Sequence, residues 1–138
     1  MKYVYIICPF IAIIICQLIK FLVEIIKYNK VNIYRLFNGN GGIPSTHTTF
    51  ISSITMLIGF KQGFDTPLFA LAFIVSLIIA YDGMGVRLET EKQAKAINEL
   101  GKIKKLNFKL KDKLGHKPIE ILAGYILGTF IAIIFSCL

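Results

Sequence analysis

The chain has 138 residues, of which 55% are hydrophobic, and 16 Lys and Arg side chains against 8 Asp and Glu side chains give it a net charge of +8. A mean hydropathy of +0.67 is not typical of a soluble domain, and long apolar runs are not typical of a nucleic-acid-binding protein. The length allows one domain, residues 1–138, with about four membrane spans. Composition therefore predicts an all-α integral membrane bundle of about four transmembrane helices and no nucleic-acid partner.

The first apolar block covers residues 3–26 and is interrupted only by Gln17, Lys20 and Glu24. A signal peptide is the alternative for an N-terminal apolar segment that follows a lysine. The block is long for a signal peptide and no A-x-A-like cleavage site follows it, which favours a retained transmembrane helix. Lys20, near its end, is expected either to extend to the lipid headgroups or to reach a polar site at the same membrane face.

Three further apolar blocks cover about residues 45–60, 67–81 and 119–138. The first two of these are short for a bilayer core of roughly 30 Å at about 1.5 Å per helical residue. They are expected either to extend further or to form a shallow hairpin that the other helices shield. The last block is long enough to span, and its Gly124-x3-Gly128 pair would allow close helix contact and a homodimer.

Small residues inside the apolar blocks are expected to serve helix packing. A run of hydroxyl side chains in the second block more often marks close helix contact than a substrate path; it consists of Thr48, Thr49, Ser52, Ser53 and Thr55. The cysteines lack CxxC spacing and a nearby histidine, so they are expected to be buried apolar residues and neither disulfides nor metal ligands. They are Cys8, Cys16 and Cys137.

Basic residues concentrate in two segments, 27–35 and 87–117, and the second holds 10 of the 16. Because Lys and Arg are retained on the cytoplasmic side, both segments are expected to face the cytoplasm and both termini to face outward. The end of the first span, the start of the second, the end of the third and the start of the fourth would then meet at one membrane face.

The second basic segment also has apolar residues at near-helical spacing. They predict an amphipathic helix on the lipid headgroups, bent near Gly101 and Asn107. A solvated basic loop attracted to anionic lipid is the alternative. The apolar positions are Ala94, Ile97, Leu100 and Ile103, followed by Leu110 and Leu114.

A glycine-rich turn, residues 38–47, leads into the second block. The helix is expected to begin with Pro44 and Ser45, so that free backbone N–H groups and the positive end of the helix dipole point towards the turn. With Gly41 and Gly42, the turn would form a phosphate cradle beside His47, although such turns also occur as ordinary interhelical loops.

Two further polar motifs stand at the ends of apolar blocks. Asp82 and Arg87 follow the third block, and because charges are costly in lipid they are expected to form a structural ion pair or to bind a ligand. His116 and Glu120 lie one helical turn apart at the start of the last block. The carboxylate can therefore accept the Nδ1 proton of the imidazole and leave Nε2 as a nucleophile.

Three motifs in this order resemble those of the divergent PAP2 family: GGIPSTH at 41–47, YDGMGVR at 81–87 and LGHKPIE at 114–120. These small bacterial and plant membrane proteins are related to the type 2 phosphatidic acid phosphatases and the vanadium haloperoxidases. The resemblance covers nearly the whole chain. It implies a protein of a bacterial cell membrane, and the positions of the basic segments place its site at the cytoplasmic face.

The resemblance to the wider phosphatase superfamily also implies a role for individual residues. His116 would be the nucleophile, Glu120 would orient it, and His47 would protonate the leaving group. Phosphate would be bound by Ser45, Arg87, Lys20, Gly41 and Gly42, with Asp82 in support. A phosphohistidine route of this kind needs neither a metal nor a cofactor.

The expected function is therefore that of a membrane phosphatase that hydrolyses a lipid phosphate or pyrophosphate, surrounded by membrane lipids. The alternative is a non-enzymatic lipid-phosphate-binding or carrier protein that keeps the anion site without turnover. A structural or assembly protein that dimerises through the last span is the third class.

Overall fold

The computed structural model describes residues 3–28, 42–106, 108–111 and 115–138. The regular elements in these ranges are α-helices: α1 (Val4–Tyr28), α3 (Thr46–Gln62), α4 (Pro67–Met84), α5 (Val86–Ile103) and α6 (Pro118–Ser136). Three stretches are long and apolar enough to cross a membrane, namely Val4–Ile26, Pro67–Ile103 and Pro118–Ser136. The expected all-α membrane bundle is confirmed.

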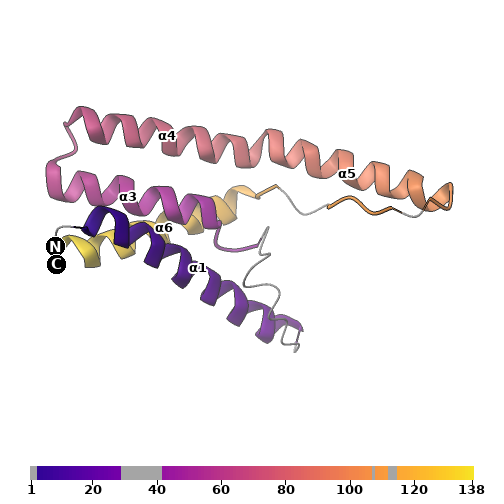
Figure 1. Ribbon diagram of the computed structural model, residues 1–138, viewed down its shortest axis with the longest axis horizontal. Helices are drawn as coiled ribbons and strands as arrows, with labels where there is room; N and C mark the ends of the chain where they lie inside the picture. The colour runs from indigo at the N-terminus through magenta and orange to yellow at the C-terminus, as the bar shows by residue number, and fades with distance from the viewer. Residues whose placement is uncertain (1–2, 29–41, 107, 112–114) are drawn as a thin grey trace.

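The two ends of the bundle differ in what they carry. Both chain termini and the turn between α3 and α4 lie at one end, as Figure 1 shows. The start of α3, the junction of α4 with α5 and the start of α6 lie towards the other end. This is the arrangement expected from the distribution of basic residues, and it brings the polar motifs towards one another.

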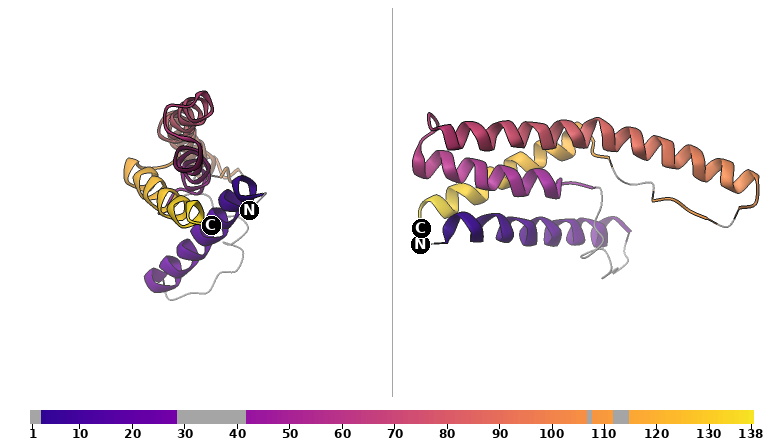
Figure 2. Two further views of the ribbon diagram at one scale, coloured as in Figure 1. Left: turned by 90° about the vertical axis from the view of Figure 1, so that its left-hand side faces the viewer. Right: turned by 45° about the horizontal axis from the view of Figure 1, so that its top comes forward.

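Helix α3 lies at the centre of the bundle and packs against α1, α4 and α6 (Figure 2). It has 17 residues, or about 26 Å at 1.5 Å per residue, and is shorter than the candidate spans. Its hydroxyl side chains are buried and donate largely to backbone carbonyls, as Thr49 Oγ1 does to the Ser45 carbonyl at 2.8 Å. The hydroxyl run thus serves helix packing, as expected.

The glycines of α6 allow its backbone to approach α3 closely. A Cβ atom at Gly124 would lie 2.8 Å from the Ser45 carbonyl oxygen, and one at Gly128 would lie 2.6 Å from the Thr49 carbonyl oxygen. Ser52 Oγ donates to the Gly124 carbonyl at 3.3 Å across the same contact. The Gly124-x3-Gly128 face is therefore covered by α3 of the same chain.

The apolar core lies between α1, α3 and α6, near the end with the termini. It is formed by Val4, Cys8, Ala12, Leu57, Ile131, Ala132 and Phe135. Cys16 is also buried. Cys137, by contrast, is exposed, so the expectation that it is buried is wrong; α6 ends at Ser136 and leaves it beyond the packed helix.

Helix α5 continues α4 as a long rod that projects beyond the rest of the bundle (Figure 1). The joint is Gly85, whose φ of −96° and ψ of −95° are not helical, although its N–H still donates to the Tyr81 carbonyl at 2.8 Å. The predicted amphipathic helix is present. It follows the direction of α4 instead of lying apart from it, and it ends at Ile103, close to the bend expected near Gly101.

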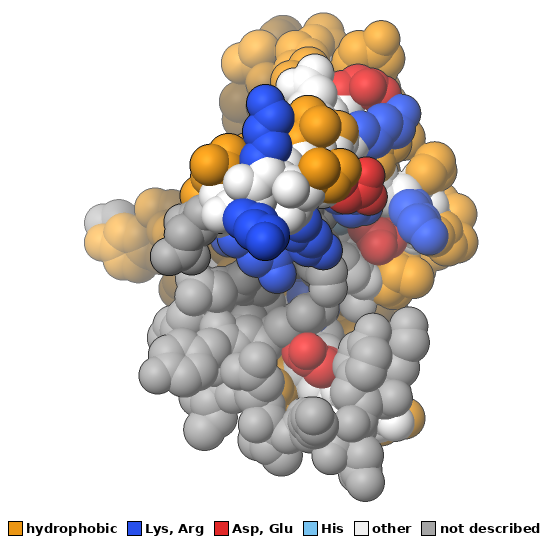
Figure 3. All heavy atoms as spheres, turned by 90° about the vertical axis from the view of Figure 1, so that its right-hand side faces the viewer, with side chains coloured by type: hydrophobic (Ala, Val, Ile, Leu, Met, Phe, Trp, Pro, Cys, Tyr) orange, Lys and Arg blue, Asp and Glu red, His pale blue; other side chains and the backbone are white. Residues whose placement is uncertain are grey.

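The chain then returns along α5 towards the bundle. Asn98 holds the returning segment with two hydrogen bonds, donating to the Leu110 carbonyl at 2.9 Å and accepting from its N–H at 2.7 Å. Lysines and exposed apolar side chains share the free end of this hairpin (Figure 3). The expected bend at Asn107 and the apolar position Leu114 lie outside the described residues.

Candidate functional site

His116 and Glu120 form the pair that their spacing predicts. His116 Nδ1 lies 2.9 Å from Glu120 Oε2, and their side chains are only 5% and 15% exposed. The same carboxylate oxygen accepts the Lys117 N–H at 3.2 Å at the start of α6. Because a carboxylate accepts the Nδ1 proton, the lone pair of the neutral imidazole lies on Nε2.

The backbone around His116 is fixed by the α4–α5 rod. Its N–H donates to the Gly83 carbonyl at 3.1 Å, and the preceding Gly115 N–H donates to Glu91 Oε2 at 3.0 Å. A Cβ atom at Gly115 would lie 2.6 Å from Leu88 Cα, so a glycine is needed for this approach. The chain therefore enters α6 in close contact with both halves of the rod.

His47 lies in the first turn of α3 and faces His116. The two ring centroids are 6.3 Å apart and the rings are inclined at 61°. Arg87 Nη1 lies 3.5 Å from His47 Nε2. Since a guanidinium can only donate, this contact requires that Nε2 accepts and that the neutral ring carries its proton on Nδ1.

The surroundings of His47 disfavour its charged form. Burial is the largest cause that lowers the pKa of His47, followed by electrostatic interaction with Arg87, His116 and Lys20, while Asp82 raises it. His47 is outside the three candidate spans. An anion bound beside these cationic side chains would stabilise the protonated form of His47.

Arg87 takes part in two interactions at the joint of the rod. Its Nε lies 2.6 Å from Asp82 Oδ2, and the two side chains are 41% and 39% exposed. The pair joins the last turn of α4 to the first turn of α5 across Gly85. Arg87 forms the expected ion pair with Asp82. Its guanidinium also reaches His47, so the geometry is compatible with ligand binding as well.

The expected phosphate cradle is only partly formed. Ser45 is the N-cap of α3, and its hydroxyl accepts from Thr48 Oγ1 at 3.1 Å. Its backbone N–H donates to the Glu120 carbonyl at 2.9 Å, so this donor does not point at a ligand. Gly42 has a φ of +94°, whereas Gly41 lies outside the described residues.

Lys20 does not extend to the headgroups. It is 3% exposed, and its Nζ donates to Thr46 Oγ1 at 2.7 Å, next to His47 in the chain. The positive charge of Lys20 therefore lies beside the start of α3. Thr46, which the sequence analysis did not single out, fixes it there.

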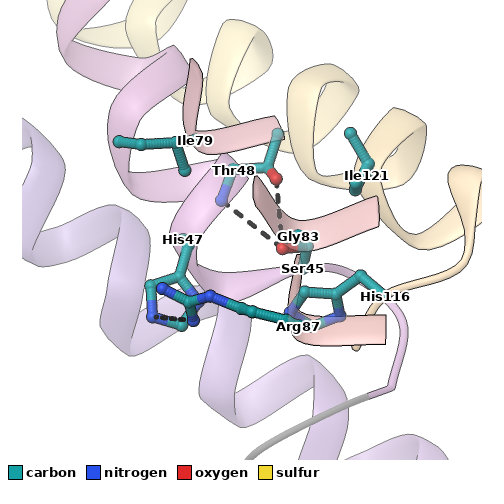
Figure 4. A pocket seen from close by; sticks show the side chains of 8 residues that line it. All are labelled: Ser45, His47, Thr48, Ile79, Gly83, Arg87, His116 and Ile121. Carbon is teal, nitrogen blue, oxygen red and sulfur yellow. Dashed lines mark hydrogen bonds between the residues drawn. The ribbon is translucent and has the colours of Figure 1, made fainter. Parts of the chain in front are cut away.

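A small cavity lies where these elements meet, and Figure 4 shows that the rings of His47 and His116 flank the Arg87 side chain. The lining residues are Ser45, His47, Thr48, Ile79, Gly83, Arg87, His116 and Ile121. Its volume of about 10 Å³ is about that of one water site. A phosphoryl group is larger than this volume, so side chains that line the cavity must move before one can bind.

The structure thus brings four of the predicted site residues around one cavity: His47, Arg87, His116 and Ser45. Glu120 contacts His116 and Asp82 contacts Arg87, whereas Lys20 contacts Thr46, the residue before His47. Among the described residues, no three His, Cys, Asp or Glu side chains are placed to hold a metal ion. Glu91 was missed, since nothing in the sequence relates it to a residue 24 positions later.

These features define a helical membrane protein with a polar site at one end of its bundle, built from two histidines, an arginine and a serine. The chain belongs to the divergent PAP2 family, whose model matches residues 1–131. It is 30% identical to the uncharacterized membrane protein YuiD of Bacillus subtilis (strain 168), over 91% of this chain and 89% of that protein. No solved structure matches it.

Proposed function

We propose that the protein is a phosphatase of the bacterial cell membrane that hydrolyses a lipid phosphate or pyrophosphate through a phosphohistidine. The observation that carries this proposal is the facing pair of histidines, with ring centroids 6.3 Å apart and His116 hydrogen-bonded to Glu120. A nucleophile oriented by a carboxylate and a second group able to donate a proton are the two parts that such a reaction needs.

In the proposed reaction, His116 Nε2 attacks phosphorus while the bond from phosphorus to the leaving oxygen breaks. Protonated His47 gives its proton to that oxygen, so an alcohol departs from a phosphate monoester and a lipid phosphate departs from a pyrophosphate. A water molecule then attacks the phosphohistidine, His47 takes a proton from it, and inorganic phosphate leaves with Nε2 restored. Arg87 and the Ser45 hydroxyl line the cavity and would stabilise the phosphoryl oxygens.

A lipid substrate is supported by the position of the site. The cavity lies at an end of the bundle, beside the joint at which the apolar α4 gives way to the basic α5. Exposed apolar side chains line α4 up to Tyr81 and Met84, as expected for a surface in contact with acyl chains. The distribution of Lys and Arg supports a cytoplasmic orientation of this end.

The assay is phosphate release by the full chain in detergent, with a diacylglycerol phosphate and a polyprenyl pyrophosphate as substrates. We expect turnover that EDTA does not reduce and that vanadate inhibits, since vanadate mimics the phosphoryl group in the transition state. Binding of these lipids without phosphate release would instead identify a lipid-phosphate-binding protein. If the protein neither binds these lipids nor releases phosphate from them, both functions are contradicted.

Anion binding should also depend on pH through His47. Its pKa is lowered in the free protein, and an anion in the cavity would raise it, so binding takes up a proton. Affinity is then highest below the free-state pKa and is lost as the pH rises through the bound-state pKa, by up to about tenfold per pH unit between the two.

Sulfate is a suitable probe for this pH dependence, because it stays a dianion between pH 5 and pH 8 while His titrates there. Its dissociation constant can be followed by the thermal shift of the detergent-solubilised protein. The variant His47→Gln should bind sulfate with little pH dependence. An equal pH dependence in the native protein and in this variant would exclude His47 as the titrating group.

A further inference from the structure

Glu91 joins the projecting helix α5 to the residue that precedes His116. Its Oε2 accepts the Gly115 N–H at 3.0 Å, and its Oε1 lies 2.5 Å from Lys95 Nζ, one turn further along α5. One carboxylate thus bridges a lysine of its own helix and the backbone of the returning chain.

Glu91 is more buried than the residues of a neighbouring charged pair within α5. Its side chain is 16% exposed, whereas Glu89 and Lys92 pair at 60% and 62% exposure on the outer face. An exposed pair contributes little, but a shielded carboxylate that accepts a backbone N–H makes one of the stronger classes of hydrogen bond. The contact with Gly115 is therefore suited to fix the chain.

Three hydrogen bonds between described residues restrain the chain around His116. The ring is held by Glu120, the N–H of His116 by the Gly83 carbonyl, and the N–H of Gly115 by Glu91. Asn98 of α5 also holds the returning chain, but at Leu110; the Glu91 contact is the side-chain hydrogen bond from α5 that lies directly beside His116 in the part of the chain that the structure describes. Loss of this contact would let His116 move relative to Arg87 and His47.

We propose that Glu91 is a positioning residue that holds His116 in register with Arg87 across the cavity. This inference rests on the proposed function for its kinetic consequence, but the positioning itself can be measured without turnover. The variant Glu91→Ala removes the hydrogen-bond acceptor. Glu91→Gln keeps an acceptor oxygen at the same length, and Glu89→Ala is the matched control two residues away on the exposed face.

The first measurement is the rate at which diethyl pyrocarbonate modifies each histidine of the full chain in detergent, followed by peptide mass spectrometry. The chain has only two histidines; His116 is 5% exposed, whereas His47 is partly buried but still reaches the surface. We expect Glu91→Ala to raise the modification rate of His116 about tenfold, the ratio for loss of one hydrogen bond to a charged group, and to leave that of His47 unchanged. Glu91→Gln should lie near the native rate.

The second measurement is phosphatase kinetics with the same variants. Misplacing a nucleophile impairs the chemical step more than substrate binding, so kcat should fall about tenfold or more in Glu91→Ala with KM little changed, and Glu91→Gln should recover most of it. A purely stabilising role would lower the amount of active protein without making His116 selectively reactive.

The outcomes separate the two proposals. If the native protein releases no phosphate but His116 becomes reactive in Glu91→Ala, the proposed function fails and the positioning stands. If His116 reacts at the same rate in Glu91→Ala and Glu89→Ala, the positioning role is overturned, whatever the activity. A parallel rise for both histidines would show general unfolding and would also overturn it.

Discussion

Replacing His116 by alanine is expected to reduce phosphate release at least about a thousandfold, because the variant has no nucleophile to form the covalent intermediate. The loss should be equal for all substrates, since each of them must pass through the same phosphohistidine. Binding of sulfate should persist, because Arg87 and Ser45 still line the cavity. The measurement is kcat/KM with a lipid phosphate and with an aryl phosphate.

His47 should behave differently in the same assay. In His47→Ala the leaving oxygen must depart without a proton, which typically costs about a hundredfold to ten-thousandfold. An aryl phosphate has a leaving group that is stable as an anion, so its hydrolysis should fall much less than that of the lipid phosphate. This difference between substrates distinguishes a general acid from a residue that only binds phosphate.

A covalent intermediate gives an independent check. Brief reaction with a radiolabelled substrate, followed by denaturation in alkali, should leave label on the peptide that contains His116, because phosphohistidine is stable to base and labile to acid. His47→Ala should still form it from an aryl phosphate. Label on the His47 peptide instead would reverse the two roles, and undiminished turnover in both alanine variants would contradict the mechanism.

Short-range spacing predicted the local parts of this site well. His116 and Glu120 lie one turn apart, and their hydrogen bond follows from the geometry of a helix start. The convergence of motifs from α3, the α4–α5 junction and α6 followed from topology, because charge distribution placed these ends at one face. Neither inference needed knowledge of side-chain packing.

Contacts across long sequence separations could not be predicted in this way. Arg87 and His116 are separated by a basic segment whose path the sequence does not define, and only the return of the chain along α5 brings them to one cavity. The same path creates the Glu91 contact with Gly115. Such contacts depend on the residue at which a hairpin turns, which here is just past Ile103.

The glycine-rich turn shows a second limit of prediction from sequence. Its composition indicated free N–H groups at a helix start, yet the Ser45 N–H is bonded to the Glu120 carbonyl. Sequence gives the number of donors at a helix N-terminus but not their partners, because another helix can supply a carbonyl. Side chains lining the cavity, chiefly Arg87, are therefore the better candidates for binding the phosphoryl oxygens.

The glycine pair of α6 illustrates why a motif does not identify its partner. Gly124-x3-Gly128 indicates a close helix contact, and a homodimer satisfies the pattern as well as α3 does. Whether the glycines pack against α3 or against a second copy depends on the shape of the surface that faces them. The small hydroxyl side chains of α3, including Ser52 and Ser53, supply a surface flat enough for the α6 backbone to approach within the chain.

The stability of the bundle should consequently depend strongly on Gly128. In Gly128→Leu, even the first atom of the new side chain would lie 2.6 Å from the Thr49 carbonyl oxygen and 2.9 Å from the Ser53 nitrogen, both of which are backbone atoms. Overpacking of this kind typically costs about 1–3 kcal/mol, and more where the backbone cannot move. We expect the melting temperature in detergent to fall by about 10 °C.

The matched control is Ala70→Leu, which adds the same side chain to an exposed position of α4. It should leave the melting temperature nearly unchanged. Size-exclusion chromatography with light scattering completes the comparison, because a glycine face used between two copies would give a different result. Gly128→Leu would then yield a smaller oligomer with an unchanged melting temperature, whereas disruption of the α3–α6 contact lowers the melting temperature whatever the oligomeric state.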